Sequence, residues 1–345
     1  MIFRLFNFFK NNNIAFCIIN GYKDILEQID TESDIDILLK LESFSHIEDI
    51  LKKFCIEENL KIVQALHHDL WAKNIFLFNP IDGQYLNLDL YGELSRKEKV
   101  FFEEIDIFNT LGVYEGIPIL SSEKEFINYL IKKLDKDDLS KENFMHLKSL
   151  YIRDELKCTE HLTKLFPQKY KLLVDAFKND SFQLIKQTRD EIVLDFYNNI
   201  KVNKKRSLLN LKRTIKRVIK PTGLTISFLG PDGSGKSTII DTLLEKRLPF
   251  RRDDYFHLKP VITKKVSLQD EMVTDPHKHV PYSPPKSYIK LLYFLYQYNV
   301  GWLKNISNIK IKSSLIIFDR YFDDMLVDYK RYRYGGSLKV AKFAR

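Results

Sequence analysis

Residues 223–245 read GLTISFLGPDGSGKSTIIDTLLE. The apolar run 224–229 predicts a strand, and residues 238–246 predict a helix. Between them, residues 230–237 match the spacing G-x-x-x-x-G-K-[ST], which binds phosphate where it joins a strand to a helix. We therefore predict an α/β fold with a parallel sheet and a nucleotide site at this turn, which we call the phosphate loop.

The residue types of the phosphate loop suit an anionic ligand. Glycines let backbone N–H groups approach phosphate oxygens, and the N-terminus of the following helix adds partial positive charge. Lys236 is expected to reach the β- and γ-phosphates, and Ser237 is expected to bind Mg²⁺. ATP and Mg²⁺ are thus the predicted cofactors, and the binding residues are Gly230, Asp232, Gly233, Ser234, Gly235, Lys236, Ser237 and Thr238.

A second apolar run, 314–318, ends in Asp319-Arg320-Tyr321. Its composition is typical of a buried strand. A carboxylate at the C-terminal end of a strand, beside a phosphate loop, is well placed to organise Mg²⁺. We predict this metal role for Asp319, and we predict that Arg320 binds a phosphate by bidentate contacts.

GPDGSGKST at 230–238 and FDRY at 318–321 resemble the motifs of the thymidylate kinase branch of nucleoside monophosphate kinases. The resemblance implies an ATP- and Mg²⁺-dependent phosphotransferase whose catalytic residues include Lys236, Asp319 and Arg320. By the same analogy, Lys259 contacts an anionic acceptor.

The resemblance extends over about residues 222–345. Within this range, 275–298 and 318–336 look like a divergent subgroup associated with bacterial surface-polysaccharide gene sets. The implied acceptor is a small nucleotide or a glycan-linked molecule. The family pattern continues with another strand and an Arg-rich lid, so we expect a kinase-like domain that is truncated or split. Arg331 or Arg333 either replaces the lid arginine or belongs to a solvated helix end.

The N-terminal part carries a second set of acids. In Ser33-Asp34-Ile35-Asp36-Ile37, the two carboxylates are two residues apart on a predicted strand and point to the same face. Asp89 follows in a similar polar–apolar alternation beside Asn87. Two aligned carboxylates can hold Mg²⁺ on a nucleotide, and a third can complete the site and activate a hydroxyl group.

With Gly21 upstream, this pattern resembles the nucleotidyltransferase superfamily. The resemblance implies that Asp34 and Asp36 bind metal, that Asp89 is the third catalytic acid and that Gly21 helps to hold the nucleotide. The family usually has Gly-Ser or Gly-Gly at the turn, whereas this chain has Gly21-Tyr22. An active transferase and a binding or regulatory domain are therefore both open interpretations.

The patterns along the chain predict four parts. Residues 1–120 form a nucleotidyltransferase-like α+β domain, 121–200 a helical extension, 201–221 a basic amphipathic linker helix, and 222–345 the thymidylate-kinase-like domain. In the first part we expect the following elements: a helix at 2–10, strands at 14–19 and 35–39, helical spacing over 44–58, and a hairpin of 73–78 and 84–91.

The positive charge is concentrated in one segment. Residues 201–220 contain nine Lys or Arg and no acid, while the rest of the chain holds 46 basic and 46 acidic residues. A broadly basic nucleic-acid binder is thereby excluded. The segment is interpreted either as a linker helix that covers a neighbouring domain or as a peripheral contact to an anionic membrane.

Other features of the composition narrow the class of protein. Three scattered cysteines exclude a disulfide framework. No apolar run reaches the length of a membrane span and no signal peptide is apparent, so we expect a cytoplasmic protein, or one bound to the inner face of the membrane. The aromatic stretch 288–302 has helical spacing and is interpreted as core or homodimer packing.

Three functions follow as hypotheses. The first is the kinase-like phosphotransferase, with a nucleotide and a small phosphate acceptor as ligands. The second is a nucleotidyltransferase that uses the N-terminal acids, with the phosphate-loop half binding nucleotide as a regulatory module. The third is a non-catalytic, nucleotide-responsive scaffold at the membrane surface.

Overall fold

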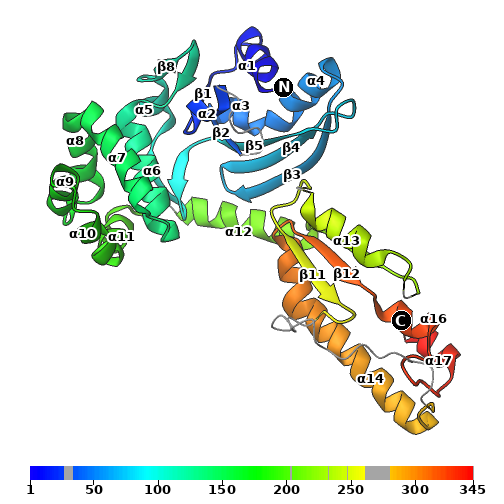
Figure 1. Cartoon of the computed structure of the whole chain (residues 1–345). Coiled ribbons are helices and arrows are strands. Elements are labelled where there is room, and N and C mark those ends of the chain that lie inside the picture. Colours follow the sequence, from blue (N-terminus) through cyan, green and yellow to red (C-terminus); the bar gives the residue numbers. More distant parts are fainter. Residues whose placement is uncertain (27–33, 203, 232, 247, 261–279, 345) are drawn as a thin grey trace. The chain divides into compact units, whose positions relative to one another are not determined.

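The computed structural model describes residues 1–26, 34–202, 204–231, 233–246, 248–260 and 280–344 (Figure 1). The chain forms two compact units, Met1–Arg213 and Thr214–Arg345. The boundary falls inside helix α12 (Lys204–Ile219). No helix in the described ranges is both long and apolar enough to cross a membrane.

Unit 1 is built on a mixed seven-stranded sheet in the order β3-β4-β5-β2-β1-β9-β8. The pairs β2–β5 and β1–β9 are parallel, and the other neighbours are antiparallel. A separate hairpin pairs β6 with β7. The strands are β1 (Phe16–Ile18), β2 (Ile35–Leu39), β3 (Lys61–Asp69), β4 (Ala72–Phe78), β5 (Tyr85–Tyr91), β6 (Leu94–Arg96), β7 (Lys99–Phe102), β8 (Gly112–Tyr114) and β9 (Ile117–Ile119).

The predicted hairpin is confirmed, because β4 and β5 pair in antiparallel register across the turn at 79–84. Gly83 has a φ of +73°, a left-handed conformation that favours glycine. The helical spacing over 44–58 corresponds to two helices, α3 (Leu41–Ser45) and α4 (Ile47–Glu57). They are separate because the backbone N–H of His46 bonds to the carbonyl of Ser43, which tightens the turn between them.

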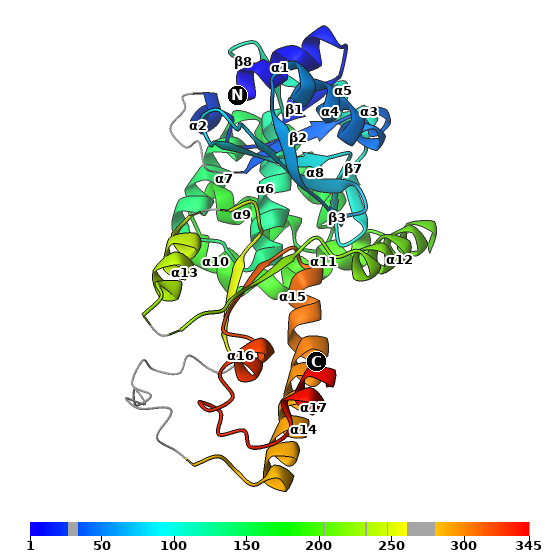
Figure 2. The ribbon, with the colours of Figure 1, turned by 90° about the vertical axis from the view of Figure 1, so that its right-hand side faces the viewer.

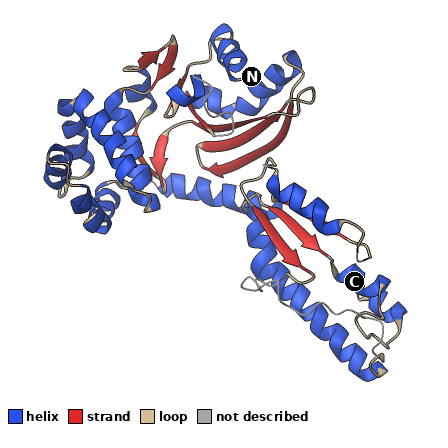
Figure 3. Ribbon diagram, viewed as in Figure 1, coloured by secondary structure: helices blue, strands red, loops and turns tan. Residues whose placement is uncertain are grey.

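Helices cover both faces of this sheet (Figure 3). On one face, α1 (Ile2–Asn11) and α4 pack against inward side chains of β2 such as Ile35 and Ile37. Successive side chains of β2 point to opposite faces of the sheet, so Leu38 lies on the other face. There it packs in the hydrophobic core that includes α6 (Ser122–Lys136). Asp36 alternates with Ile35 and Ile37 and therefore lies on the α6 side.

Residues 122–199 form a run of helices with a shared aromatic core. Phe144 and Phe177 stack with ring centroids 5.3 Å apart, and Phe126 meets Phe177 edge-on. The other short helices of unit 1 and those of the extension are α2 (Tyr22–Leu26), α5 (Glu104–Phe108), α7 (Lys141–Arg153), α8 (Glu155–Leu165), α9 (Tyr170–Lys178), α10 (Phe182–Gln187) and α11 (Arg189–Asn199).

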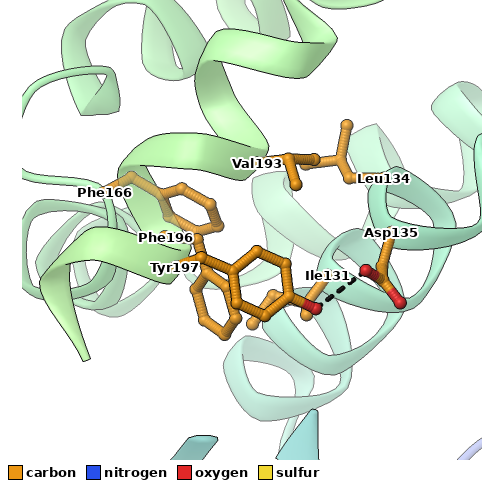
Figure 4. Close-up of a pocket in the computed structure, with 7 residues that line it drawn as sticks. All are labelled: Ile131, Leu134, Asp135, Phe166, Val193, Phe196 and Tyr197. Carbon is orange, nitrogen blue, oxygen red and sulfur yellow. Dashed lines mark hydrogen bonds between the residues drawn. The ribbon is translucent and has the colours of Figure 1, made fainter. Parts of the chain in front are cut away.

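A small cavity lies inside the helical extension (Figure 4). Its volume is about 10 Å³, roughly what one water molecule requires. The Tyr197 hydroxyl points toward Asp135 and donates a hydrogen bond of 2.7 Å to its carboxylate. Phe166 and Phe196 supply much of the remaining wall. We interpret this cavity as a packing gap that is too small for an organic ligand.

Unit 2 is a three-stranded sheet in the order β10-β12-β11, and both strand pairs are parallel. The α/β class predicted from the sequence is confirmed in this coarse form. Helices flank the strands on both sides (Figures 1 and 2). The elements are β10 (Leu224–Phe228), α13 (Lys236–Glu245), β11 (Asp253–His257), α14 (Pro284–Gly301), the π-helical turn η1 (Trp302–Ile306), α15 (Ser307–Ile311), β12 (Leu315–Asp319), α16 (Phe322–Val327) and α17 (Leu338–Phe343).

Strand β12 is the centre of unit 2. Leu315 and Ile317 face α13 with Ile240, while Ile316 and Phe318 face α15 and η1. All four of these β12 side chains are fully buried, which confirms the buried strand predicted for 314–318. Because β10 and β11 flank β12, the phosphate loop after β10 opens beside the end of β12.

Candidate active site in unit 2

The phosphate loop has the backbone conformation that its glycines predict. Gly233 and Gly235 have φ values of +79° and +82°, in the region that side chains with a Cβ rarely adopt. Helix α13 begins at Lys236, so its first backbone N–H groups face the loop. Asp232, a predicted nucleotide contact, lies outside the described residues.

A cavity of about 390 Å³ opens at this loop. It is large enough for a substantial part of a nucleotide, and charged or polar groups dominate its wall. The lining residues come from the loop and α13, from the ends of β11 and β12, and from the segment after α16: Gly233, Ser234, Gly235, Lys236, Ser237, Thr238, His257, Asp319, Arg320 and Arg331. The structure thus brings Asp319 and Arg320 to the phosphate loop.

Asp319 ends β12, in register with Phe228 of β10 and His257 of β11. One carboxylate oxygen, Oδ2, accepts a hydrogen bond of 3.3 Å from the Tyr255 hydroxyl. The other, Oδ1, is buried without a hydrogen-bond partner among the described atoms. Burial, together with the Asp319 charge, raises the pKa of Tyr255 to about 12, so this hydroxyl remains a donor.

A buried carboxylate oxygen without a donor is costly, and it marks a position where a cation would be stabilised. Mg²⁺ usually takes one or two protein oxygens and completes its shell with water and substrate phosphates. Asp319 and the Ser237 hydroxyl, which line the same cavity, fit this requirement.

Arg320 is held in a fixed position at the cavity. Its Nη1 donates to Oδ2 of Asp324 at 2.9 Å, and Tyr332 donates its hydroxyl to the same oxygen at 2.7 Å. Burial and the Asp324 charge raise the pKa of Tyr332. Arg320 also has a φ of +71°, an unusual conformation for a residue with a Cβ, and such outliers concentrate at functional sites.

The structure separates the two arginines that the sequence left as alternatives. Arg331 lines the cavity. Arg333 instead donates from Nε to the carbonyl of Val280 at 3.1 Å, and its guanidinium lies 4.3 Å from the centre of the Tyr282 ring. Arg331 is therefore the candidate for a phosphate contact, and Arg333 anchors the segment.

Two lysines differ in their placement. Lys236 donates its ammonium hydrogens to the carbonyls of Gly230 and Pro231 at 2.8 and 2.7 Å. Lys259, predicted to meet the acceptor, lies over the Phe294 ring at 5.1 Å and is not among the residues that line the cavity. Burial, and secondarily Lys290, lowers the pKa of Lys259.

The N-terminal acids are also brought close together. Asp36 and Asp89 are register partners on the parallel strands β2 and β5. The Tyr91 hydroxyl lies between them, 3.4 Å from Asp36 Oδ1 and 3.1 Å from Asp89 Oδ2. Burial and the two carboxylates raise the pKa of Tyr91 well above its usual value. Gly21, with a φ of +67°, precedes α2 as the predicted turn requires.

The partners of these acids are hydrogen-bond donors. Lys132 of α6 places its Nζ 3.0 Å from Asp36 Oδ2, and Asn74 donates to Asp89 at 3.1 Å. Asp34 is exposed and bonds to Asn87. Across the described residues, no group of three or more His, Cys, Asp or Glu side chains is arranged to hold a metal ion. The metal role of Asp34 and Asp36, and the catalytic role of Asp89, stay predictions.

Sequence reasoning did not single out Lys132 or Tyr91 at this site. Tyr91 could have been found, because it follows Asp89 by two residues and shares its face of β5. Lys132 lies 96 residues from Asp36 on a helix that carries many lysines, and no local pattern marks it.

We compared the chain with protein-family models, with curated proteins and with solved structures, and none of the three comparisons gave a match. What the protein does is therefore inferred from the chemistry of its side chains.

Proposed function

We propose that unit 2 is an ATP- and Mg²⁺-dependent phosphotransferase of the thymidylate kinase type. Its acceptor would be a small nucleotide or a glycan-linked molecule in bacterial surface-polysaccharide metabolism. The observation that carries the proposal is the partnerless, buried Oδ1 of Asp319 in the same cavity as the phosphate loop. The acids of unit 1 are left out of the proposal, because Lys132 and Tyr91 already bond to Asp36.

The proposed chemistry needs positioning and charge neutralisation more than covalent participation by the protein. Backbone N–H groups of 233–237 would bind the β- and γ-phosphates, with Lys236 between them. Ser237 and Asp319 would hold Mg²⁺, which neutralises phosphate charge. Arg320, which is fixed by Asp324 and lines the same cavity, would orient a phosphate.

Asp319→Asn tests the metal role. The wild-type protein should bind ATP about tenfold more tightly with Mg²⁺ than with EDTA, and the variant should lose this difference because it lacks one charged ligand. Isothermal titration with and without Mg²⁺ measures it. Asp323→Asn, four residues further along, is the matched control and should keep the Mg²⁺ effect. An undiminished Mg²⁺ effect in Asp319→Asn would remove the observation on which the proposal rests.

Arg331→Gln and Arg333→Gln form a matched pair. Because Arg331 lines the cavity, its loss should weaken the binding of ATP about tenfold. The affinity for ADP, which lacks the γ-phosphate, should change less than about twofold. Arg333→Gln should change neither affinity, since Arg333 is bound to Val280 and Tyr282. Equal losses for ATP and ADP in Arg331→Gln would show that Arg331 does not contact the γ-phosphate.

A further inference from the structure

Helix α12 contacts the protein through one polar face. Arg206 donates from both terminal nitrogens to the buried carboxylate of Glu93, with Nη1 at 2.9 Å. Arg213 donates to the backbone carbonyls of His67 and His68 at 3.0 and 2.8 Å. In unit 2, Arg217 donates to the carbonyl of Ile311 at 2.6 Å. These arginines recur at helical spacing and therefore share one side of α12.

The opposite side of α12 is an apolar stripe, formed by Leu208, Leu211, Ile215, Val218 and Ile219. These side chains are 49% to 71% exposed, and none of the 16 residues of α12 is buried. The sequence is interpreted either as a solvated linker helix that covers a neighbouring domain or as a membrane contact. In the structure, α12 docks through its arginine side, and the apolar stripe is the exposed side.

Lysines border the apolar stripe. At 100° per residue, Lys212, Lys216 and Lys205 lie along one flank of it, and Lys204 lies at its N-terminal end. The segment 201–220 holds nine basic residues and no acid. An exposed apolar stripe with a basic border is the pattern of helices that lie in the interface of an anionic bilayer.

We propose that the apolar stripe of α12 is a docking surface for an anionic phospholipid bilayer. Apolar side chains would enter the acyl boundary while the flanking lysines contact lipid headgroups. A second copy of the chain fits this surface poorly. In a symmetric dimer, residues 201–220 of both copies would lie together. Each segment carries nine positive charges and no acid, so the two would repel each other.

Flotation of the full chain with lipid vesicles tests the proposal. The wild-type protein should float with vesicles of phosphatidylcholine and phosphatidylserine, and should stay unbound with phosphatidylcholine alone. High salt should release it, since screening weakens the lysine contribution. Leu211→Ser with Ile215→Ser should lower the vesicle–water partition coefficient of the protein at least about tenfold. The variant lacks two apolar side chains whose transfer from water into the bilayer would favour binding.

The matched control is Leu156→Ser with Ile152→Ser, which removes the same residue types from even more exposed positions in unit 1. It should bind vesicles as the wild type does. Far-UV circular dichroism should be unchanged in both double variants, which shows that they fold. Three results would overturn the proposal: no flotation of the wild type, an equal loss in the control, or a wild-type dimer that the α12 variant converts to a monomer.

Discussion

Lys236→Ala is expected to weaken ATP binding by about ten- to one-hundredfold, the value of one hydrogen bond to a charged group. The loss in phosphoryl transfer should be larger, because charge on the transferring group increases in the transition state. The Lys236 ammonium group donates to two loop carbonyls at 2.8 and 2.7 Å, so the lysine side chain already lies over the loop where the phosphates would bind. Isothermal titration with ATP measures the affinity.

Lys246→Ala is the matched control, since Lys246 is an exposed lysine at the other end of α13. It should keep the wild-type affinity for ATP. If Lys236→Ala bound ATP as well as the wild type does, nucleotide would not bind at the phosphate loop and the proposed function would fail. A parallel loss in Lys246→Ala would instead indicate a general effect of charge on α13.

Asp324→Asn should destabilise unit 2 by about 3 kcal/mol, because it breaks the buried ion pair between Arg320 and Asp324. The side chains of Arg320 and Asp324 are 8% and 7% exposed, so water cannot replace the lost partner. The same substitution should abolish phosphoryl transfer, since it releases the guanidinium that Asp324 holds toward the cavity.

The two tryptophans permit a measurement on unit 2 alone, because Trp71 lies in unit 1 and Trp302 in unit 2. In a Trp71→Phe background, denaturant unfolding followed by fluorescence reports the environment of Trp302, which packs on β11 and β12. Tyr332→Phe is the control: it removes one hydrogen bond to Asp324 but keeps the ion pair, and should cost about 1 kcal/mol. Equal costs for both variants would argue against a structural role of the ion pair.

The candidate site in unit 2 could be predicted in large part from the sequence because its motifs are local. The phosphate loop is one contiguous stretch between a strand and a helix, and Asp319 directly follows a fully apolar run. Parallel pairing of β10 with β12 then brings the two together. Arg331 could not be separated from Arg333, because their difference depends on contacts with Val280 and Tyr282, some fifty residues away.

The N-terminal acids show what a local sequence pattern leaves open. The alternation around Asp36 correctly predicts a strand, and Asp36 does lie beside Asp89. Whether such a pair binds a cation depends on which donors approach it from the rest of the fold. Here the donor to Asp36 is Lys132 of α6, and the residue pattern of the strand does not predict which helix side chain reaches it.

The orientation of α12 was unpredictable for a related reason. Hydrophobic periodicity predicts that the apolar side of a helix packs inward. In unit 1, Glu93 and the carbonyls of His67 and His68 provide anchors for Arg206 and Arg213 instead. These acceptors lie more than a hundred residues away in the sequence, so helical spacing alone could not favour the arginine side.

The concentration of charge on α12 also affects how the protein moves in an electric field. Apart from 201–220, the chain holds equal numbers of basic and acidic residues. A negatively charged surface would therefore attract this helix and exert little net force on the remainder. Within the roughly 8 Å over which charges act at physiological ionic strength, that attraction produces a torque. The molecule would turn α12 toward the surface before any side chain touched it.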